Sequence, residues 1–222
     1  MNGQIRIYYL DYELSDTKKH HYYGRVLLSH ALTDVCQMTF SEEMLGYTQK
    51  RKPYFKALPF FFNISHCRHT VVCAFSDHPV GIDIEASRTI RESLMRRALS
   101  RDELAYVTSS PLGREERFLE LWTLKESYGK MTGEGLTDSL PCNAFILSEK
   151  PNKETDGDRA KKDEEGIFLL TREADEIKTN NPGFYLQWKR RGTADRTEPE
   201  VLSLCTDRIS PVMFCPVSLQ EG

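Results

Sequence analysis

The sequence lacks the features that mark several common classes of protein. None of its six cysteines forms a CxxC pair, so a zinc ribbon is not indicated. No apolar run is long enough to span a membrane, and the N-terminus has no hydrophobic segment typical of a secretory signal. The net charge of −3 provides no general basic field for nucleic acid. We therefore expect a protein of the reducing cytoplasm that binds neither nucleic acid nor membranes.

The common phosphate-binding and metalloprotease motifs are also missing. The chain has no GxxxxGK[ST] loop, no GxGxxG turn and no HExxH helix. Its composition is that of an ordinary globular protein, because 39% of the 222 residues are hydrophobic and 28% are charged. The length is sufficient for one large domain or two small ones. Any phosphate chemistry must therefore use another arrangement of charged residues.

The pattern of apolar and turn residues predicts both helices and strands. Helices are expected at about 16–37, 89–99, 101–108 and 114–131, and strands at about 4–10, 60–65, 70–76 and 80–85 and in four runs after residue 142. The segment 148–166 is highly charged and almost without apolar residues, which favours a flexible excursion. Because each half offers a helix and several strands, we expect an α+β fold with lobes at 1–87 and 88–222.

The stretch GIDIE at residues 81–85 contains two carboxylates on one face of a predicted strand. Residues two apart in a strand point to the same side, so Asp83 and Glu85 lie together while the isoleucines face a core. Carboxylates this close repel each other unless a cation lies between them or one is protonated. A hard ion such as Mg²⁺ prefers such oxygen ligands. The alternative is a solvated strand face, because D-x-E is a common pattern.

The stretch FNISH at residues 62–66 ends another predicted strand. His66 could bind an anion or cap a hairpin, and a histidine considered alone is more often structural. Ser65 and His66 are not expected to form a nucleophilic pair. Neighbouring strand residues point to opposite faces, and no nucleophile elbow surrounds them.

The stretch ELWTLKESYGK at residues 120–130 is typical of an amphipathic helix, but it has charges in its apolar stripe. Glu126 and Lys130 are one turn apart and could form a surface ion pair worth about 0.2–0.5 kcal/mol. Lys125 falls among apolar residues, where a charge is costly unless it meets an anion such as phosphate. Glu120 lies off this edge, and we expect it to face solvent.

Taken together, these stretches resemble the signature of the larger, Sfp-like 4′-phosphopantetheinyl transferases. That signature is a G-[IV]-D-x-E strand followed some tens of residues later by W-x-x-K-E-[AS]-x-x-K. Residues 81–85 and 122–130 match it, with Lys-Pro at 52–53 and Ser-His at 65–66 upstream. The resemblance covers residues 25–144 well and the rest in general character. It implies an α+β fold of two similar lobes, a pseudo-repeat, with the active site at their junction.

The resemblance also implies a reaction. The 4′-phosphopantetheine group of coenzyme A would be transferred to a serine hydroxyl of an apo acyl carrier or peptidyl carrier protein, releasing 3′,5′-ADP. The enzyme would act as a monomer with Mg²⁺, or Mn²⁺, as cofactor. A non-catalytic coenzyme A-binding relative is one alternative, although it would lack a carboxylate or Lys130. Another Mg²⁺-dependent phosphoryl-transfer enzyme is the second, although it would not need the Ser-His and Lys-Pro elements.

Family membership implies a role for each matched residue. Asp83, Glu85 and Glu126 would bind Mg²⁺, which would bridge the pyrophosphate of coenzyme A. Glu126 would also help to deprotonate the carrier serine, and Lys130 would neutralise the phosphates and assist the departure of 3′,5′-ADP. His66 would contact a phosphate, and Arg25, Arg51 and Lys52 would contact the nucleotide end. The residues expected to bind coenzyme A are Arg25, Arg51, Lys52, Ser65, His66, Lys125 and Lys130.

Overall fold

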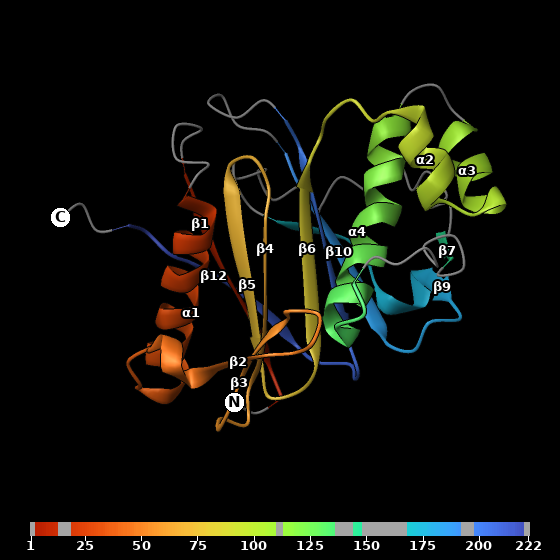
Figure 1. The fold of residues 1–222 in the computed structure, drawn as a ribbon. Coiled ribbons are helices and arrows are strands. Elements are labelled where there is room, and N and C mark those ends of the chain that lie inside the picture. The colour runs from red at the N-terminus through yellow and green to blue at the C-terminus, as the bar shows by residue number, and fades with distance from the viewer. Residues whose placement is uncertain are drawn as a thin grey trace, which may run out of the picture.

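The computed structural model confirms the predicted α+β class. It describes residues 3–12, 19–109, 113–135, 144–147, 168–191 and 198–219. Its strands form two four-stranded sheets and two short two-stranded ones. A long helix covers the outer side of each large sheet, α1 on one side of the molecule and α4 on the other (Figure 1). Within these ranges, no helix is both long and apolar enough to cross a membrane.

The first sheet combines the start of the chain with its end. In order, it contains β12 (Val212–Pro216), β1 (Ile5–Asp11), β5 (Thr70–Ser76) and β4 (Phe61–His66). β4 and β5 form the predicted antiparallel hairpin, and β5 also pairs with β1. The sequence did not predict β12, which pairs with β1 in parallel. Parallel partners need a crossover connection, and here almost the whole chain forms it.

The second sheet is antiparallel throughout. It contains β6 (Val80–Ala86), β11 (Glu200–Thr206), β10 (Phe184–Arg190) and β8 (Leu169–Arg172). The predicted lobe boundary at residue 87 does not follow the sheets, because β6 precedes it and belongs to the second sheet, while β12 follows it and belongs to the first. A strand exchanged at each end ties the two halves together. The internal repeat stays a prediction, and the predicted excursion at 148–166 lies outside the described residues.

The helices form close to their predicted positions. α1 (His20–Cys36) packs on β1, β4 and β5, and α4 (Arg114–Thr132) packs on β6, β10 and β11. α2 (Glu92–Ala98) and α3 (Arg101–Thr108) lie beside α4 (Figure 1). The short elements are η2 (Glu42–Met44), β2 (Leu45–Tyr47), β3 (Pro53–Phe55), β7 (Phe145–Leu147), η4 (Ala174–Glu176) and β9 (Ile177–Thr179).

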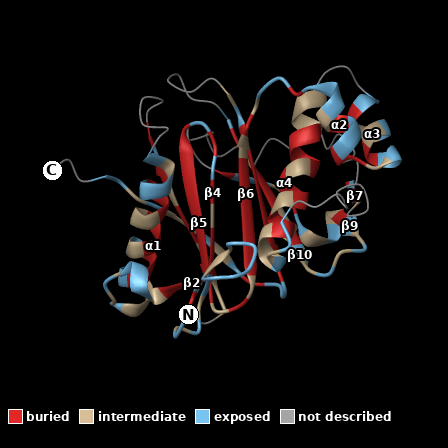
Figure 2. Ribbon diagram, viewed as in Figure 1, coloured by how far each residue is buried: buried red, intermediate tan, exposed pale blue. Residues whose placement is uncertain are grey.

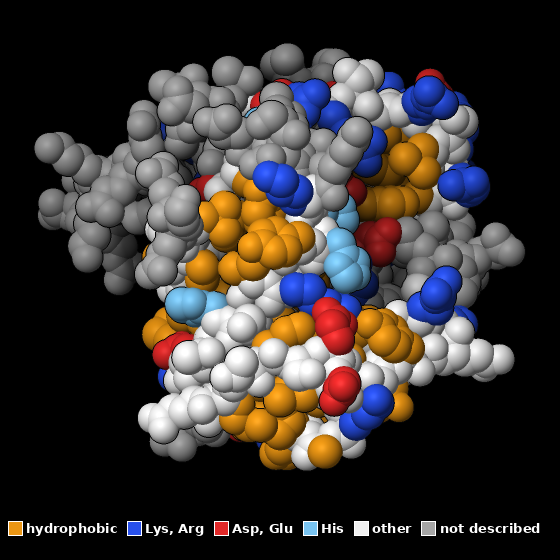
Figure 3. All heavy atoms as spheres, turned by 60° about the vertical axis from the view of Figure 1, so that its left-hand side comes forward, with side chains coloured by type: hydrophobic (Ala, Val, Ile, Leu, Met, Phe, Trp, Pro, Cys, Tyr) orange, Lys and Arg blue, Asp and Glu red, His pale blue; other side chains and the backbone are white. Residues whose placement is uncertain are grey.

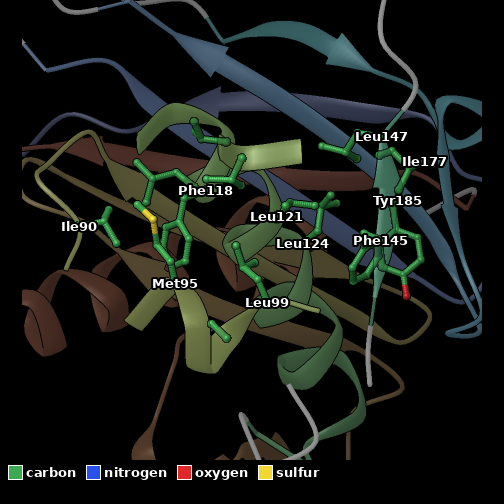
Figure 4. Packing of buried hydrophobic residues seen from close by; sticks show 14 of the residues in the cluster. Ile90, Met95, Leu99, Phe118, Leu121, Leu124, Phe145, Leu147, Ile177 and Tyr185 are labelled. Atoms are coloured by element: carbon green, nitrogen blue, oxygen red, sulfur yellow. The ribbon is translucent and has the colours of Figure 1, made fainter. Parts of the chain in front are cut away.

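Three clusters of buried apolar side chains hold these layers together. Figure 2 shows buried residues along the strands of the large sheets and on parts of α1 and α4. One lies between α1 and the first sheet, and one lies between the two sheets. The third surrounds α4, where Leu121 and Leu124 lie between Met95 on one side and Phe145 and Tyr185 on the other (Figure 4). Each fully buried side chain of this kind contributes about 1.5–3 kcal/mol. The packing therefore fixes both long helices against the strands between them.

Candidate functional site

The site lies where β4 of the first sheet runs beside β6 of the second (Figure 1). These two described strands share no backbone ladder, and side chains of β4 take its place. Asn63 Oδ1 accepts the N–H of Ile82 at 2.9 Å, and Ser65 Oγ accepts the N–H of Ile84 at 3.4 Å. Both donors are on the edge of β6 that does not pair with β11. The side chains at 63 and 65 therefore join the sheets and bring the Ser-His pair beside the carboxylates of β6.

The close approach of α4 to β6 depends on Gly81. A Cβ atom at this position would lie 2.1 Å from the carbonyl oxygen of Ser127 and 2.4 Å from the amide nitrogen of Met131. These are backbone atoms, which cannot move aside as the end of a side chain can. The glycine of GIDIE therefore permits the contact that places Glu126 and Lys130 over the acidic face of β6.

Lys130 reaches the carboxylate of Asp83. Its Nζ donates to Asp83 Oδ1 at 2.6 Å and to Ser65 Oγ at 2.8 Å, while the Ser65 hydroxyl donates to the same Oδ1 at 2.8 Å. The other carboxylate oxygen, Asp83 Oδ2, is buried and has no hydrogen-bond partner in the described part of the chain. A buried oxygen without a donor is costly, so it marks a place where a cation fits.

The three carboxylates predicted to bind metal influence one another. Burial raises the pKa of Glu126 to about 7, and the charge of Asp83 acts in the same direction while Lys130 opposes it. Burial and the charge of Asp83 also raise the pKa of Glu85, against the effects of Arg88 and Trp122. This excess of negative charge favours a cation. The effect of Trp122 on the pKa of Glu85 was not predicted, because helix periodicity indicates only the core side of the indole.

The carboxylates do not form a ready-made metal cage. Among the residues that the structure describes, no group of three or more His, Cys, Asp or Glu side chains is arranged to hold a metal ion. Lys130 Nζ takes the position next to Asp83 Oδ1 instead, at 2.6 Å. The donor set thus fits a divalent cation in its chemistry and charge, but a cation has to compete with Lys130 for Asp83.

Two histidines border the site on the side of the first sheet. His66 is at the end of β4 and His20 is at the start of α1, and the centroids of their rings are 4.2 Å apart. Desolvation, together with the charges of His20 and Lys130, lowers the pKa of His66 to about 4. His66 is therefore neutral near neutral pH and can donate one N–H to a phosphate. His20 belongs to the basic run at 18–21, a possible anion site, but it was not among the predicted site residues.

The residues predicted at the nucleotide end lie on or beside the β2–β3 hairpin. Lys52 Nζ donates to the carbonyl of Met131 at 2.7 Å, so the hairpin docks on the end of α4 next to Lys130. Arg51 is exposed in the turn of this hairpin. Arg25 of α1 pairs with Glu42 at 2.7 Å and donates to Tyr47 of β2 at 3.0 Å. The structure thus brings Lys52 next to the site and places both arginines along the hairpin.

Two predictions about the charged side chains of α4 are wrong. Lys125 does not face the site, because its side chain is fully buried and its Nζ lies 3.0 Å from Glu103 Oε1 in α3. Glu120 does not face solvent, because it pairs with Lys189 at 2.6 Å and with Arg172 at 3.3 Å and only 5% of its side chain is exposed. A helix wheel indicates which face a residue occupies, but it cannot show that another element brings an opposite charge to that face.

A cavity of 400 Å³ extends the site from Glu85 along the surface, lined also by Cys67, Arg68, residues 86–89 and Glu198. A second cavity of 640 Å³ shares Arg88 and Thr89 with it and contains two further arginines, Arg91 and Arg97. Figure 3 shows acidic, basic and histidine side chains gathered along a crease on one face, with hydrophobic side chains on both sides. These features together offer an open, charged surface large enough for a ligand.

Known proteins are similar to the part of the chain that contains β6 and α4. Residues 79–179 match the family model described as the 4′-phosphopantetheinyl transferase superfamily. The chain is 35% identical over 128 residues to the 4′-phosphopantetheinyl transferase psf-1 of Bacillus pumilus, covering 57% of this chain and 55% of that protein. It is 34% identical over 126 residues to Sfp of Bacillus subtilis, covering 56% and 55%, and 30% identical over 138 residues to HetI of Nostoc sp., covering 59% and 58%. The chain thus spans little more than half the length of these curated relatives.

Proposed function

We propose that this chain, whose residues 79–179 match the model of the 4′-phosphopantetheinyl transferase superfamily, is a carrier-protein-modifying enzyme of that superfamily. It transfers the 4′-phosphopantetheine group of coenzyme A to a serine hydroxyl of an apo acyl or peptidyl carrier protein and releases 3′,5′-ADP. The observation that carries this proposal is the contact of Lys130 on α4 with Asp83 on β6. Two stretches that are far apart in the sequence meet there, with Glu85 and Glu126 beside them.

Asp83, Glu85 and Glu126 would hold a Mg²⁺ or Mn²⁺ ion. The unpartnered oxygen of Asp83 and the raised pKa values of both glutamates fit such an ion. When bound, the ion neutralises charge on the pyrophosphate of coenzyme A. Ser65 donates to Asp83, and through this hydrogen bond it keeps the carboxylate turned towards α4.

The residues of the chain supply the proton transfer and the binding. The serine oxygen attacks the phosphorus that bears the pantetheine, a new P–O bond forms, and the P–O bond to 3′,5′-ADP breaks with its electron pair on the leaving group. Glu126 takes the serine proton, and the ammonium group of Lys130 neutralises the charge that develops on the departing phosphate. His66 binds a phosphate of coenzyme A, with Lys52, Arg51 and Arg25 towards the nucleotide end.

We propose that the chain acts as a monomer in the cytoplasm. The cysteines that the structure describes, Cys36, Cys67, Cys73, Cys205 and Cys215, are all free. Free cysteines agree with a reducing compartment. Coenzyme A and an apo carrier protein are then its expected partners, with no role for nucleic acid or a membrane.

Incubation with coenzyme A, Mg²⁺ and several apo carrier proteins, followed by mass spectrometry of the carriers, tests this function. We expect a mass gain of one phosphopantetheine group, and its loss when EDTA removes the metal. Asp83→Asn preserves the side-chain volume, so we expect it to abolish the gain while circular dichroism stays unchanged. Asp207→Asn, a change of an exposed carboxylate after β11, should keep full activity.

Each of the other outcomes has a clear meaning. No mass gain on any carrier would overturn the transferase. Coenzyme A binding without transfer would then identify a non-catalytic relative. Hydrolysis of coenzyme A or another phosphate ester without a carrier would identify a different Mg²⁺-dependent phosphoryl-transfer enzyme.

A further inference from the structure

Glu103 and Lys125 form a buried ion pair behind the candidate site. Their side chains are 1% and 0% exposed, and Lys125 Nζ lies 3.0 Å from Glu103 Oε1. Glu103 is already held by backbone donors from two elements. Its Oε2 accepts the N–H of Ser100 at 2.7 Å in the capping box of α3, and its Oε1 accepts the N–H of Phe145, in β7, at 2.9 Å. The carboxylate is therefore a fixed point to which α4 is attached through Lys125.

Stability alone does not account for a charge pair at this position. Two well-packed apolar side chains of similar volume are often as stabilising as a buried ion pair, because the pair loses its hydration. What an ion pair adds is direction, since a charged hydrogen bond tolerates little change in distance or angle. The pair therefore favours one placement of α4 over neighbouring ones that apolar packing alone would allow.

The placement of α4 matters because Lys125 immediately precedes Glu126. Consecutive helix residues point about 100° apart, so Lys125 faces α3 while Glu126 faces the acidic side of β6. The other side of α4 rests on Gly81, against the backbone of Ser127 and Met131. A rotation of about 10° would move a carboxylate at the rim of the helix by about 1 Å. Misplacement on that scale can cost about 100-fold in rate.

We propose that Lys125 and Glu103 are positioning residues that hold Glu126 in place and that neither binds coenzyme A. This inference rests on the transferase function proposed above. It replaces the sequence-based expectation that Lys125 contacts phosphate. It also explains why the lysine within the apolar stripe is tolerated, because its charge is paired with the buried carboxylate of Glu103.

The test uses Lys125→Met, Glu103→Gln and the double variant in the full chain, with Lys125→Arg as the conservative replacement. Steady-state kinetics give kcat and the KM for coenzyme A, and calorimetry gives the affinity for Mn²⁺ without coenzyme A. We expect each single variant to lower kcat about 10- to 100-fold and to weaken Mn²⁺ binding, with KM for coenzyme A changed less than about 2-fold. The double variant should be no worse than either single one, because both remove the same contact. Lys125→Arg should restore much of the loss.

Leu28→Ala in α1 is the control for stability, because it removes buried apolar contacts from the other long helix. It should lower the thermal midpoint at least as much as Lys125→Met but leave kcat and Mn²⁺ affinity unchanged. Should Lys125→Met raise KM for coenzyme A with Mn²⁺ binding intact, Lys125 binds coenzyme A and the inference is wrong. Unchanged kcat and Mn²⁺ affinity in the folded variants would also overturn it. If the wild type modifies no carrier, the transferase fails, and the Mn²⁺ affinities still decide whether the pair positions Glu126.

Discussion

The two long helices cover their sheets in different ways. α1 buries a mainly apolar stripe that includes Tyr23, Leu27 and Leu28. α4 buries polar and charged side chains as well, namely Glu120, Thr123, Lys125 and Ser127, and each has a hydrogen-bond or ion-pair partner. Apolar packing tolerates small shifts, whereas polar contacts favour one geometry. The helix that carries Glu126 and Lys130 is thus the one held by directional contacts.

The largest difference between the two helices should appear at their glycine contacts. Gly81→Ala would place a methyl group 2.1 Å from a backbone oxygen of α4, so we expect a loss of about 3 kcal/mol or more in the free energy of unfolding. Gly24→Ala in α1 meets only the side chain of Ile64 at 3.1 Å, and alanine favours a helix. We expect that change to stay within about 1 kcal/mol.

Urea unfolding of both glycine variants measures this difference. A loss below about 1 kcal/mol for Gly81→Ala would mean that α4 can withdraw from β6 at little cost. The directional contacts of α4 would then not define its position, and the comparison with α1 would fail.

A smaller effect is expected at the buried carboxylate of α4. Glu120→Gln removes the negative charge that Lys189 and Arg172 share in a buried site, so we expect a loss of about 2–3 kcal/mol, reduced from the fully buried case because Lys189 can reach water and also pairs with Glu116. Glu116→Gln is the matched control, because Glu116 pairs with the same lysine at 2.7 Å but its side chain is 45% exposed. That loss should be below about 1 kcal/mol.

The pH dependence of stability checks the same carboxylate. Burial raises the pKa of Glu120, but Lys189 and Arg172 lower it more, so the pKa lies below its ordinary value of 4.5. A lowered pKa means that the contribution is present above the unfolded pKa and is lost as the pH falls through the folded one. The free energy of unfolding should therefore fall less steeply in Glu120→Gln than in the wild type when the pH drops below 4.5. Parallel curves would contradict the buried pairing.

The local patterns of the sequence predicted the helices and strands better than they predicted which of these elements lie next to one another. Alternation and helical spacing lie within one element, and the structure confirms the β4–β5 hairpin and the helix at α4. The parallel pairing of β12 with β1 joins residues about two hundred positions apart, and no local pattern records it. The ion-pair partner of a charged residue could not be predicted for the same reason, because it lies on another element far away in the sequence. Lys125 was expected to bind a ligand, but it pairs with Glu103 of α3. Glu120 was expected to face solvent, but it pairs with Arg172 of β8 and Lys189 of β10.

The site shows the same division. The two carboxylates of GIDIE share a face because strand geometry requires it, and this follows from spacing alone. The approach of Lys130 to Asp83 depends on how α4 crosses β6. Only the resemblance to a family suggested that these two residues meet. Neither composition nor hydrophobic periodicity predicted that Asn63 and Ser65 join β4 to β6. The two strands are connected there by side-chain hydrogen bonds to the backbone and not by a ladder of backbone hydrogen bonds.

The smallest effect is expected at a polar contact between α1 and β1. Asp34 Oδ2 accepts hydrogen bonds from Arg6 and Tyr8 of β1, each at 2.6 Å, but 43% of the aspartate side chain is exposed. Asp34→Asn keeps an oxygen that can accept the Tyr8 hydroxyl, and it removes only a solvent-screened charge. We expect a loss of about 0.2–1 kcal/mol in urea unfolding, with kcat and Mn²⁺ affinity unchanged. A loss of about 2 kcal/mol or more would show that α1 also depends on a directional contact, and the difference between the helices would then lie in their charges and not in how they are held.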